Sequence, residues 1–370
     1  MRLLFAGGGT AGHINPALAL ANYFSAKDGA EIRFVGTKEG LETSLVPDAG
    51  YPLDFIRVHG FRRSLTWENL KNLAELPFAV SAADKIIRNF CPDAVIGTGG
   101  YVCGPVLYAA AKRGIPTMVH ESNAFPGITT KLLSSYVDTV ALGVEDASFY
   151  LPKAKHILVT GTPIRPSLLE GNEFEARRML KLDSRPFIVC FGGSLGARDF
   201  NRTLVDWICK TAKKETYQIM MGTGKLHQFE EVKKRFQEHG VDMDTLSNVT
   251  VCEYIYDMNI VMQAADIVVS RAGASTLCEL TALGKPSVLV PSPYVTDNHQ
   301  EHNARALERG GAAKVIVESD FTPERLEKTL AAMTAQKETL VSMKRSAIAM
   351  GHTDATQQLY RETKRLMGIE

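Results

Sequence analysis

Short apolar runs rich in β-branched residues alternate with helical patterns along the whole chain, and this alternation limits the possible folds more than any other feature. Alternating strands and helices are typical of parallel sheets that carry helices on both faces. The expected strands are residues 2–6, 31–36, 53–58, 93–97, 117–121, 139–143, 187–192, 217–222, 249–254, 266–270, 287–291 and 312–316. The sequence therefore predicts an α/β fold with doubly wound parallel sheets.

The alternation starts afresh near the middle of the chain. Segment 159–168, VTGTPIRPSL, contains two prolines and a glycine and is the expected hinge. After it the chain opens again with a strand, a glycine turn and a helix. We therefore expect two doubly wound domains that face a cleft, over residues 1–162 and 163–345, and a last helix within 346–370 that packs back on the first domain. Ligands in such folds bind at the carboxyl ends of the strands.

Composition and charge exclude several classes of protein. Of 370 residues, 45% are hydrophobic and 22% are charged, which suits globular domains with large cores. A net charge of +1 predicts no nucleic-acid partner. The six cysteines lack C-x-x-C spacing, and Cys190 and Cys252 lie in apolar runs, so we expect buried thiols in a reducing compartment. No apolar run is long enough for a signal peptide or a spanning helix, which predicts a soluble or peripheral cytosolic protein.

Four glycine-rich loops follow expected strands and precede expected helices. They are GGGTAGH (7–13), GTGGYVCGP (97–105), GGSLGAR (192–198) and SRAGAST (270–276), called here the first to fourth glycine loops. A helix N-terminus favours phosphate because its N–H groups lack partners, and glycines let the backbone approach an anion closely. Glycines also serve tight packing between a strand and a helix, but four such loops are stronger evidence than one. We expect at least two of them to bind phosphate.

The first glycine loop has the spacing of the dinucleotide-binding fingerprint, G-x-G-x-x-G, at Gly7, Gly9 and Gly12. A nicotinamide site also needs an acid at the tip of the second strand, which holds the ribose. The second strand ends without an acid, and Glu39 is expected to open a helix. His13 would in addition lie inside the pyrophosphate turn. We therefore interpret this segment as a phosphate loop with another role.

Charged residues near the hinge and the fourth glycine loop are candidates for ligand binding. Glu279 lies about one helical turn beyond Ser275 and could accept both hydroxyls of a ribose, although a solvated helix acid is the plainer interpretation. Arg165, in the hinge, could clamp a phosphate or could lie on the surface after a turn. Arg271 belongs to the same group of candidates around the fourth loop.

Polar residues supply further candidates. His13 could be a general base, because histidine titrates near working pH, or it could only bind phosphate or cap its helix. Segment 295–303, VTDNHQEHN, could bind sugar hydroxyls, and helix capping is the alternative. The pair Asp242 and Asp244 lies in a polar stretch, which we interpret as a solvated loop. The sequence therefore predicts no metal site.

Segment 59–78 combines bulky apolar residues with basic ones. The residues that could meet a membrane are Phe61, Arg62, Arg63, Trp67, Leu70 and Lys71. Such a mixture suits an anionic membrane surface. The alternative is an ordinary amphipathic helix packed on the sheet, and the tryptophan and the arginine pair favour the membrane.

Together these motifs resemble one family. The segments GGGTAGHINPALALA, GTGGYVCGP, HESNAFPG, GTPIR, GGSLGAR, EYIYDM, RAGASTLCEL and DNHQEHNA are similar, in their order and over nearly the whole chain, to the peripheral glycosyltransferases of the MurG type that make lipid II in bacterial wall synthesis. The resemblance implies a type B glycosyltransferase fold of two Rossmann-like domains. It implies inverting transfer of N-acetylglucosamine from UDP to the muramyl 4-hydroxyl of undecaprenyl-pyrophosphoryl-N-acetylmuramyl-pentapeptide (lipid I), with no metal and no other cofactor.

The same resemblance implies where substrates and partners bind. The donor, UDP-N-acetylglucosamine, belongs to the C-terminal domain. The lipid acceptor belongs to the N-terminal domain, which docks on the inner leaflet of the cell membrane. The protein is then expected to be peripheral, on the cytoplasmic face, with other wall-synthesis enzymes as further partners.

Site residues are also implied by the resemblance. His13 and Glu279 are expected in catalysis. The expected contacts to donor and sugar are Thr10, Ala11, Gly12, Asn123, Arg165, Ser194, Ile255, Gly273, Ala274, Ser275, Thr276, Leu277, Cys278, His299 and Gln300, and those to the acceptor diphosphate are Gly8, Gly9, Gly99, Gly100 and Tyr101. The family usually has Gly where Ala11 stands and Gln where Ser122 stands. Whether position 11 needs a positive φ therefore stays open, as does the division of sugar contacts between His299 and Gln300.

Other classes of function stay open on the residues alone. A UDP-N-acetylglucosamine epimerase of similar fold would share the donor site but would need neither a lipid acceptor nor a membrane surface. A nicotinamide oxidoreductase is weakened by the missing acid at the second strand. A pure binding module is disfavoured because the expected cleft carries candidate bases as well as anion loops.

Overall fold

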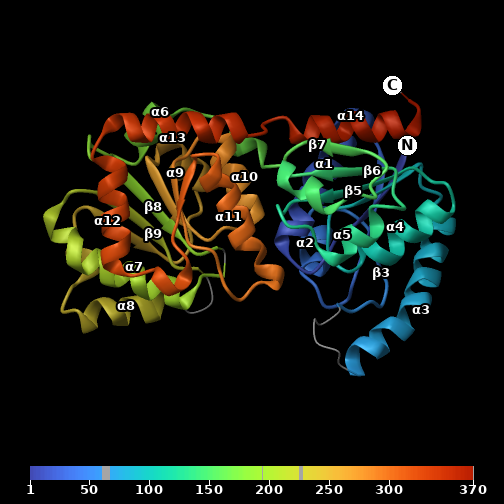
Figure 1. Ribbon diagram of the computed structural model, residues 1–370, viewed down its shortest axis with the longest axis horizontal. Helices are drawn as coiled ribbons and strands as arrows, with labels where there is room; N and C mark the ends of the chain where they lie inside the picture. The colour runs from blue at the N-terminus through green and yellow to red at the C-terminus, as the bar shows by residue number, and fades with distance from the viewer. Residues whose placement is uncertain (61–66, 194, 225–227, 370) are drawn as a thin grey trace. The chain divides into compact units, whose positions relative to one another are not determined.

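The computed structural model describes residues 1–60, 67–193, 195–224 and 228–369 (Figure 1). The chain forms two compact units. Unit 1 comprises Met1–Ile164 and Thr353–Glu370, and unit 2 comprises Arg165–His352. Each unit is built on its own parallel sheet, so the expected doubly wound α/β fold is confirmed.

The sheet of unit 1 has the strand order β3-β2-β1-β4-β5-β6-β7, and every pairing is parallel. Its strands are β1 (Arg2–Ala6), β2 (Glu31–Gly36), β3 (Leu53–Phe55), β4 (Ala94–Gly97), β5 (Thr117–Glu121), β6 (Thr139–Leu142) and β7 (Ile157–Val159). Central strands read as unbroken apolar runs because helices cover both faces. The sequence did not predict β7, a three-residue edge strand that is only half-buried.

Two helical layers enclose this sheet. The helices of unit 1 are α1 (Ala11–Asp28), α2 (Glu42–Asp48), α3 (Trp67–Phe90), α4 (Cys103–Lys112), α5 (Ile128–Leu133) and α14 (Ala355–Met367), with the 3₁₀ turn η1 (Glu145–Tyr150). Apolar side chains of α3, α4 and α5 form one core with the sheet, and those of α1, α2 and α14 form the other. The carboxyl ends of the strands, where the chain turns into these helices, are therefore left for function.

The last helix, α14, belongs to unit 1 although its sequence follows unit 2. Its Tyr360 ring lies 5.1 Å from the ring of Tyr23 and 4.7 Å from that of Phe24, both on α1. The carboxylate of Glu362 accepts a hydrogen bond from Thr139 on β6. These contacts fix α14 against both α1 and the sheet.

Unit 2 repeats the topology of the first six strands of unit 1. Its order is β10-β9-β8-β11-β12-β13, again with every pairing parallel. The strands are β8 (Phe187–Phe191), β9 (Gln218–Gly222), β10 (Val249–Cys252), β11 (Ile267–Ser270), β12 (Ser287–Leu289) and β13 (Ala313–Val315). In each unit the strand order reverses beside the first strand, which is where ligands bind in such sheets.

The sheet of unit 2 is also covered on both faces (Figure 1). Its helices are α6 (Glu173–Met179), α7 (Arg198–Thr211), α8 (Gln228–Glu238), α9 (Met258–Ala264), α10 (Ala274–Ala282), α11 (His299–Arg309), α12 (Pro323–Thr334) and α13 (Lys337–Met350), with short 3₁₀ turns η2 (Pro166–Leu168), η3 (Ala212–Lys214), η4 (Met243–Thr245), η5 (Thr296–Asn298) and η6 (Glu318–Asp320). Helices α7, α8 and α12 enclose one core around the fully buried Trp207, whose indole N–H donates to Glu327 at 2.8 Å. Helices α6, α9, α10 and α11 enclose the other.

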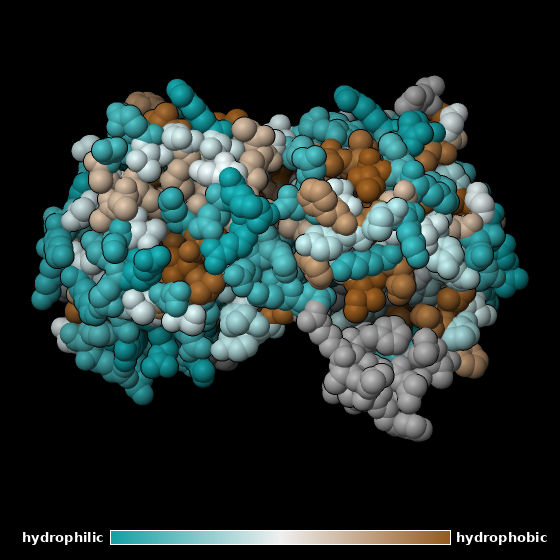
Figure 2. All heavy atoms as spheres, viewed as in Figure 1, coloured by the Kyte–Doolittle hydropathy of each residue, from teal (hydrophilic) through white to brown (hydrophobic). Residues whose placement is uncertain are grey.

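Polar side chains cover most of the surface visible in Figure 2, as expected when the apolar side chains fill the cores. Among the described residues, no helix is both long enough and apolar enough to cross a membrane. The cysteines are free thiols. Cys103 and Cys190 are fully buried, and burial raises the pKa of Cys103 to about 12, so these thiols stay protonated and inert.

Candidate active site

The first and second glycine loops lie side by side at the carboxyl edge of unit 1, because they follow the paired strands β1 and β4. The two loops touch through glycine. A Cβ atom at Gly100, where φ is +85°, would lie only 2.5 Å from the carbonyl oxygen of Gly8. Gly99 has a φ of +114°, and its own Cβ would lie 2.5 Å from the ring of His13. The glycines of the second loop are therefore required by packing against the first loop.

His13 stands in the first turn of α1 with its ring against the second loop. Its Nδ1 lies 3.1 Å from the carbonyl oxygen of Gly8 and 3.4 Å from the hydroxyl of Thr10. Its own carbonyl accepts a hydrogen bond from the Thr98 hydroxyl at 2.7 Å. A carbonyl oxygen can only accept, so the Nδ1 that meets it carries the proton. A neutral His13 then has its lone pair on Nε2, as a general base requires.

The conformation of the first loop answers the question raised by Ala11. The left-handed residue is Gly9, with a φ of +85°, whereas Ala11 is the first residue of α1 and its φ is not positive. Alanine at position 11 is therefore compatible with the loop. Thr10 is the extended residue that precedes the helix, and its side chain makes no capping bond.

Sequence reasoning missed one residue of this site, Glu42. The expected helix at Glu39 begins instead at Glu42, since residues 37–41 turn first. The Glu42 carboxylate is fully buried and accepts hydrogen bonds from the N–H of Gly9 at 2.9 Å, the N–H of Thr37 at 2.9 Å and the hydroxyl of Thr37 at 2.8 Å. Nothing in the spacing of segment 37–48 distinguishes this acid from its neighbours.

The turn after β5 is held by another buried carboxylate, that of Glu121. It accepts hydrogen bonds from the N–H of Asn123 at 3.1 Å, the side-chain amide of Asn123 at 3.0 Å and the N–H of Gly127 at 3.1 Å. The neighbouring His120 is buried and lies 3.0 Å from the carbonyl of Gly161. Burial lowers the pKa of His120, so this imidazole is neutral. Asn123 thus has a fixed orientation at the same edge as His13.

In unit 2 the third and fourth glycine loops follow the paired strands β8 and β11. Gly273 is the extended residue that precedes α10, and the first turn of that helix contains Ala274, Ser275 and Thr276. The N–H groups of a first helical turn lack intrahelical partners, so this helix end can receive an anion. Leu277 is buried in the core and Cys278 is half-buried, and Ser194 of the third loop lies outside the described residues.

Glu279 and Arg165 lie together. The carboxylate oxygen Oε1 of Glu279 lies 3.6 Å from Nη2 of Arg165. The Glu279 side chain is 18% exposed, whereas that of Arg165 is 60% exposed. Burial raises the pKa of Glu279, and the charge of Arg165 offsets part of this effect. A mostly buried carboxylate one turn inside a helix N-terminus, beside an exposed cation, is suited to bind hydroxyls next to a phosphate.

Arg271, by contrast, is an internal structural residue. Its guanidinium donates to the carbonyl of Val290 at 3.1 Å, pairs with Glu318 and lies 5.1 Å from the ring centroid of Phe200. Only 8% of the residue is exposed. The sequence suggested that Arg271 binds a ligand at the fourth loop. This hypothesis is wrong, because its guanidinium points into the protein interior and is bound by Val290 and Glu318.

The remaining predicted residues of unit 2 lie near the strand ends. Ile255 is buried and packs on Gly222 at the end of β9. Gln300 uses its side-chain carbonyl to accept from the N–H of Ser292 at 2.9 Å, which leaves its amide nitrogen as the atom that can donate to a ligand. His299 is the first residue of α11 and follows Asn298, which has a left-handed φ of 48°.

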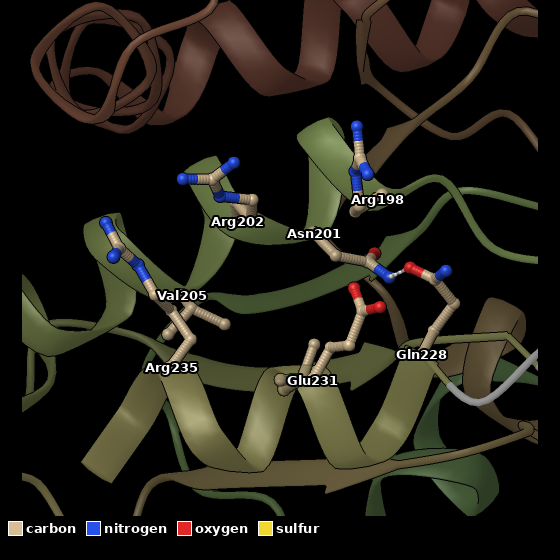
Figure 3. A pocket seen from close by; sticks show the side chains of 8 residues that line it. Arg198, Asn201, Arg202, Val205, Gln228, Glu231 and Arg235 are labelled. Atoms are coloured by element: carbon tan, nitrogen blue, oxygen red, sulfur yellow. Dashed lines mark hydrogen bonds between the residues drawn. The ribbon is translucent and has the colours of Figure 1, made fainter. Parts of the chain in front are cut away.

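A small cavity lies between α7 and α8, and Arg198, the last residue of the third glycine loop, is part of its lining (Figure 3). Its lining includes Arg198, Asn201, Arg202, Gln228, Glu231 and Arg235. Arg235 is already bound by Asp206 at 2.8 and 3.0 Å. The cavity volume of about 10 Å³ is room for one water molecule, so it is no substrate site.

Two sets of predictions concern membrane and metal. Phe61, Arg62 and Arg63 lie outside the described residues, and Trp67, Leu70 and Lys71 belong to α3 without described side chains. Of the acidic pair, Asp244 lies in the turn η4 and Asp242 precedes it as its cap, and both are exposed. Within the described parts of the chain, no group of three His, Cys, Asp or Glu residues is placed to hold a metal ion.

Comparison with known proteins identifies the family to which the chain is similar. The N-terminal domain of glycosyltransferase family 28 matches residues 3–142, and the C-terminal domain of the same family matches residues 187–359. The UDP-N-acetylglucosamine--N-acetylmuramyl-(pentapeptide) pyrophosphoryl-undecaprenol N-acetylglucosamine transferase of Ruminiclostridium cellulolyticum is 44% identical over 99% of this chain and 100% of its own. A transferase of the same name from Bacillus cereus is 45% identical, also over 99% and 100%.

Solved structures agree with the sequence relatives. The crystal structure of Acinetobacter baumannii MurG has a TM-score of 0.80 at 28% identity and covers 98% of this chain and 99% of that one. UDP-GlcNAc 2-epimerase from Neisseria meningitidis has a TM-score of 0.66 at 16% identity over 98% and 99%, so it shares the fold alone.

Two parallel α/β units, each matched by a domain of glycosyltransferase family 28, define a glycosyltransferase of the type B fold. Identity of 44% over the whole length is more specific. The chain belongs to the MurG family of UDP-N-acetylglucosamine--N-acetylmuramyl-(pentapeptide) pyrophosphoryl-undecaprenol N-acetylglucosamine transferases.

Proposed function

We propose that this protein transfers N-acetylglucosamine from UDP-N-acetylglucosamine to the muramyl 4-hydroxyl of lipid I and so makes lipid II for peptidoglycan. The observation that carries the proposal is 44% identity over 99% of the chain to a transferase of this name. The geometry of His13 supports the proposal. Nδ1 is engaged by the Gly8 carbonyl, so the lone pair of the neutral ring is on Nε2, beside the first and second glycine loops. The resemblance to this family further supports a division of roles in which unit 2 binds the donor and unit 1 binds the acceptor.

The donor is held by unit 2. The first turn of α10, from Gly273 to Thr276, receives the diphosphate, together with Ser194 and Arg165. Glu279 accepts the ribose hydroxyls, and the backbone of Ile255 meets the uracil. Gln300 donates its amide to a sugar hydroxyl, beside His299. As UDP leaves, negative charge grows on the diphosphate, and helix N–H groups and a guanidinium stabilise that charge.

The acceptor is activated by unit 1. Nε2 of His13 takes the proton of the 4-hydroxyl while its oxygen bonds to C1 of the donor sugar. The bond from C1 to the UDP oxygen breaks on the opposite side, so a single displacement inverts the anomeric centre. The acceptor diphosphate lies at the second loop, over Gly99, Gly100 and Tyr101 before α4. The sequence also suggested Gly8 and Gly9 for this diphosphate, but the N–H of Gly9 donates to Glu42 and the carbonyl of Gly8 meets His13, so we propose the second loop for this role.

A transfer assay tests the proposal directly. Purified protein is incubated with radiolabelled UDP-N-acetylglucosamine, with and without a lipid-pyrophosphate acceptor that carries the muramyl pentapeptide. We expect labelled lipid product only when the acceptor is present. Isomerisation of the sugar without acceptor would instead support an epimerase of the same fold.

We also infer that unit 1 docks on the cytoplasmic face of the membrane through segment 61–78. The lipid tail of the acceptor cannot leave the bilayer, so the unit that binds it must reach the surface. Clustered cations beside bulky apolar residues supply both the electrostatic and the apolar attraction. Phe78, the last residue of this segment, is 77% exposed.

Charge reversal tests the docking segment. Arg62→Glu combined with Arg63→Glu should weaken binding to anionic vesicles sharply and flatten its salt dependence. The reason is that each basic residue near such a surface contributes about 1 kcal/mol and salt screens it. Activity on a short-chain, water-soluble acceptor should survive. Vesicle co-sedimentation over a salt series measures the effect.

The matched control reverses the same charge elsewhere. Lys213 and Lys214 are exposed neighbours on η3 in unit 2, and Lys213→Glu with Lys214→Glu should leave vesicle binding near the wild-type level. Equal losses in both double variants would mean that only total charge matters. Wild-type binding by the arginine variant would show that segment 61–78 is an internal packing helix.

A further inference from the structure

We propose that Glu42 is a positioning residue for the transfer reaction, because it locks the peptide group that orients His13. The inference rests on the proposed function, in which His13 takes the acceptor proton. Glu42 contacts neither substrate in this scheme. It acts through the first glycine loop.

The peptide group between Gly8 and Gly9 links the two side chains. A trans peptide is planar, and its C=O and N–H point in opposite directions. The N–H end of this group belongs to Gly9 and donates to Oε2 of Glu42 at 2.9 Å. The C=O end belongs to Gly8 and lies 3.1 Å from Nδ1 of His13. Rotation of this one plane would break both contacts together.

Glycine has wide conformational freedom, so the peptide plane between Gly8 and Gly9 needs a contact that fixes its orientation. Gly9 has a φ of +85°, and no atom of the described residues beyond its two chain neighbours would lie within 4 Å of a Cβ placed there, so packed side chains do not confine it. The bond to Glu42 supplies the missing restraint. It fixes the direction of the Gly8 carbonyl, and this carbonyl selects the tautomer of His13 that leaves Nε2 unprotonated.

The carboxylate itself is held firmly and is charged. Burial alone would raise the pKa of Glu42, but hydrogen bonds from the N–H groups of Thr37 and Gly9 and from the Thr37 hydroxyl lower it overall. Three surrounding glycines leave room for it. A Cβ at Gly8 would lie 2.5 Å from Oε1, one at Gly36 would lie 2.6 Å from Cγ, and one at Gly40 would overlap the carboxylate. This part of the fold is shaped around one ionised side chain.

The same carboxylate explains why the first loop differs from a dinucleotide loop. In a phosphate loop the backbone N–H groups point at the anion. Here the N–H of Gly9 is turned inward to Glu42, and a negative charge lies directly behind the loop. Like charges disfavour each other, so the first loop is shaped for the base and the second loop is left for the acceptor diphosphate.

The variant Glu42→Gln tests this role. A side-chain amide places an N–H group toward either Gly9 or Thr37, both of which donate, so one of these bonds is lost while the volume is kept. We expect kcat to fall by roughly tenfold to 10²-fold, the scale of a small misplacement of a catalytic group. The donor KM should stay near the wild-type value, because the donor binds to unit 2. Steady-state kinetics of lipid product formation measures both.

Thr37→Val is the matched control. The Thr37 hydroxyl and the Thr37 N–H both donate to Oε1 of Glu42. The valine variant loses only the hydroxyl bond and keeps the bonds from the N–H groups of Thr37 and Gly9. Its thermal stability should fall like that of a variant with one lost hydrogen bond, whereas its kcat should stay near wild type. An equal loss of kcat in Thr37→Val would mean that general destabilisation is the cause and would overturn the proposal.

A double-mutant cycle separates positioning from mere structural support. If Glu42 acts through His13, Glu42→Gln should cost little further kcat once His13 is alanine, because coupled residues are not additive. Additive losses would overturn the proposal. Should Glu42→Gln not fold, Glu42→Asp keeps the charge but is too short to reach both donors, and the same kcat loss and non-additivity are expected. A wild-type protein that fails to make lipid product would refute the proposed function, whereas an active wild type with an unimpaired Glu42→Gln variant refutes the positioning role alone.

Discussion

Replacing His13 with alanine should lower kcat by about 10²-fold or more, the usual scale of general acid–base catalysis. Nδ1 of the imidazole lies on the Gly8 carbonyl, so Nε2 is the atom that we propose takes the proton of the acceptor hydroxyl. The wild-type enzyme should show an acidic limb in its pH–rate profile, because a protonated imidazole cannot act as a base. His13→Ala should lack that limb. Initial rates of lipid product over a pH series measure both effects.

His13→Asn is the control for lost packing and lost orientation. Its amide can still donate to the Gly8 carbonyl, but it has no basic nitrogen in the place of Nε2. We expect it to be folded and as slow as His13→Ala. If either variant keeps the acidic limb and loses only a few-fold in rate, His13 binds substrate and another group or water takes the proton.

Glu279→Ala should lower kcat/KM for the donor by at least tenfold, a loss of roughly 1.4 kcal/mol of transition-state stabilisation. The carboxylate is mostly buried and lies one helical turn beyond the end of α10 that we propose for the diphosphate, so it is suited to accept two ribose hydroxyls. Calorimetric titration with UDP should show the same loss, since the ribose belongs to UDP.

The pKa of Glu279 predicts a pH dependence with a definite sign. Burial raises this pKa, and hydroxyl donors bind the ionised form better, so donor affinity should fall as the pH drops through the raised value. Glu279→Gln cannot ionise and should lose this dependence. Glu324, an exposed acid paired with Lys210 on the same unit, is the control, and Glu324→Ala should leave donor kinetics unchanged. Unchanged donor kinetics in a folded Glu279→Ala variant would refute the assignment.

Arg165 takes part in the same site through its ion pair with Glu279. Its guanidinium lies 3.6 Å from the Glu279 carboxylate, so a ribose bound to Glu279 as we propose would share or displace this contact. The arginine is exposed enough to turn toward the diphosphate. The ion pair thus brings together the two side chains that we propose for the ribose and the diphosphate.

The sheets could be predicted from the sequence because their strands are buried on both faces. Such strands read as apolar runs, and every expected one is found in the described chain. Two short elements, β7 and the start of α2, were not predicted because they carry no clear apolar or capping pattern. Strand β7 is short and half-buried, and α2 opens at Glu42, where no capping pattern marks the start. A short edge element depends on its neighbours more than on its own residues.

The sequence by itself determined the α/β class, the restart of the pattern in a second unit, the glycine loops at strand ends and the motifs that define the family. Each of these is written in local periodicity or in a short segment, so no distant contact is needed to see it. Only the tertiary structure decided what the polar residues do. It turned Arg271 into the core, joined Arg165 to Glu279 and brought Glu42 under a loop 33 positions away. The physical reason is that hydrogen-bond partners are chosen by proximity in space, and a buried carboxylate must find its donors wherever the fold brings them.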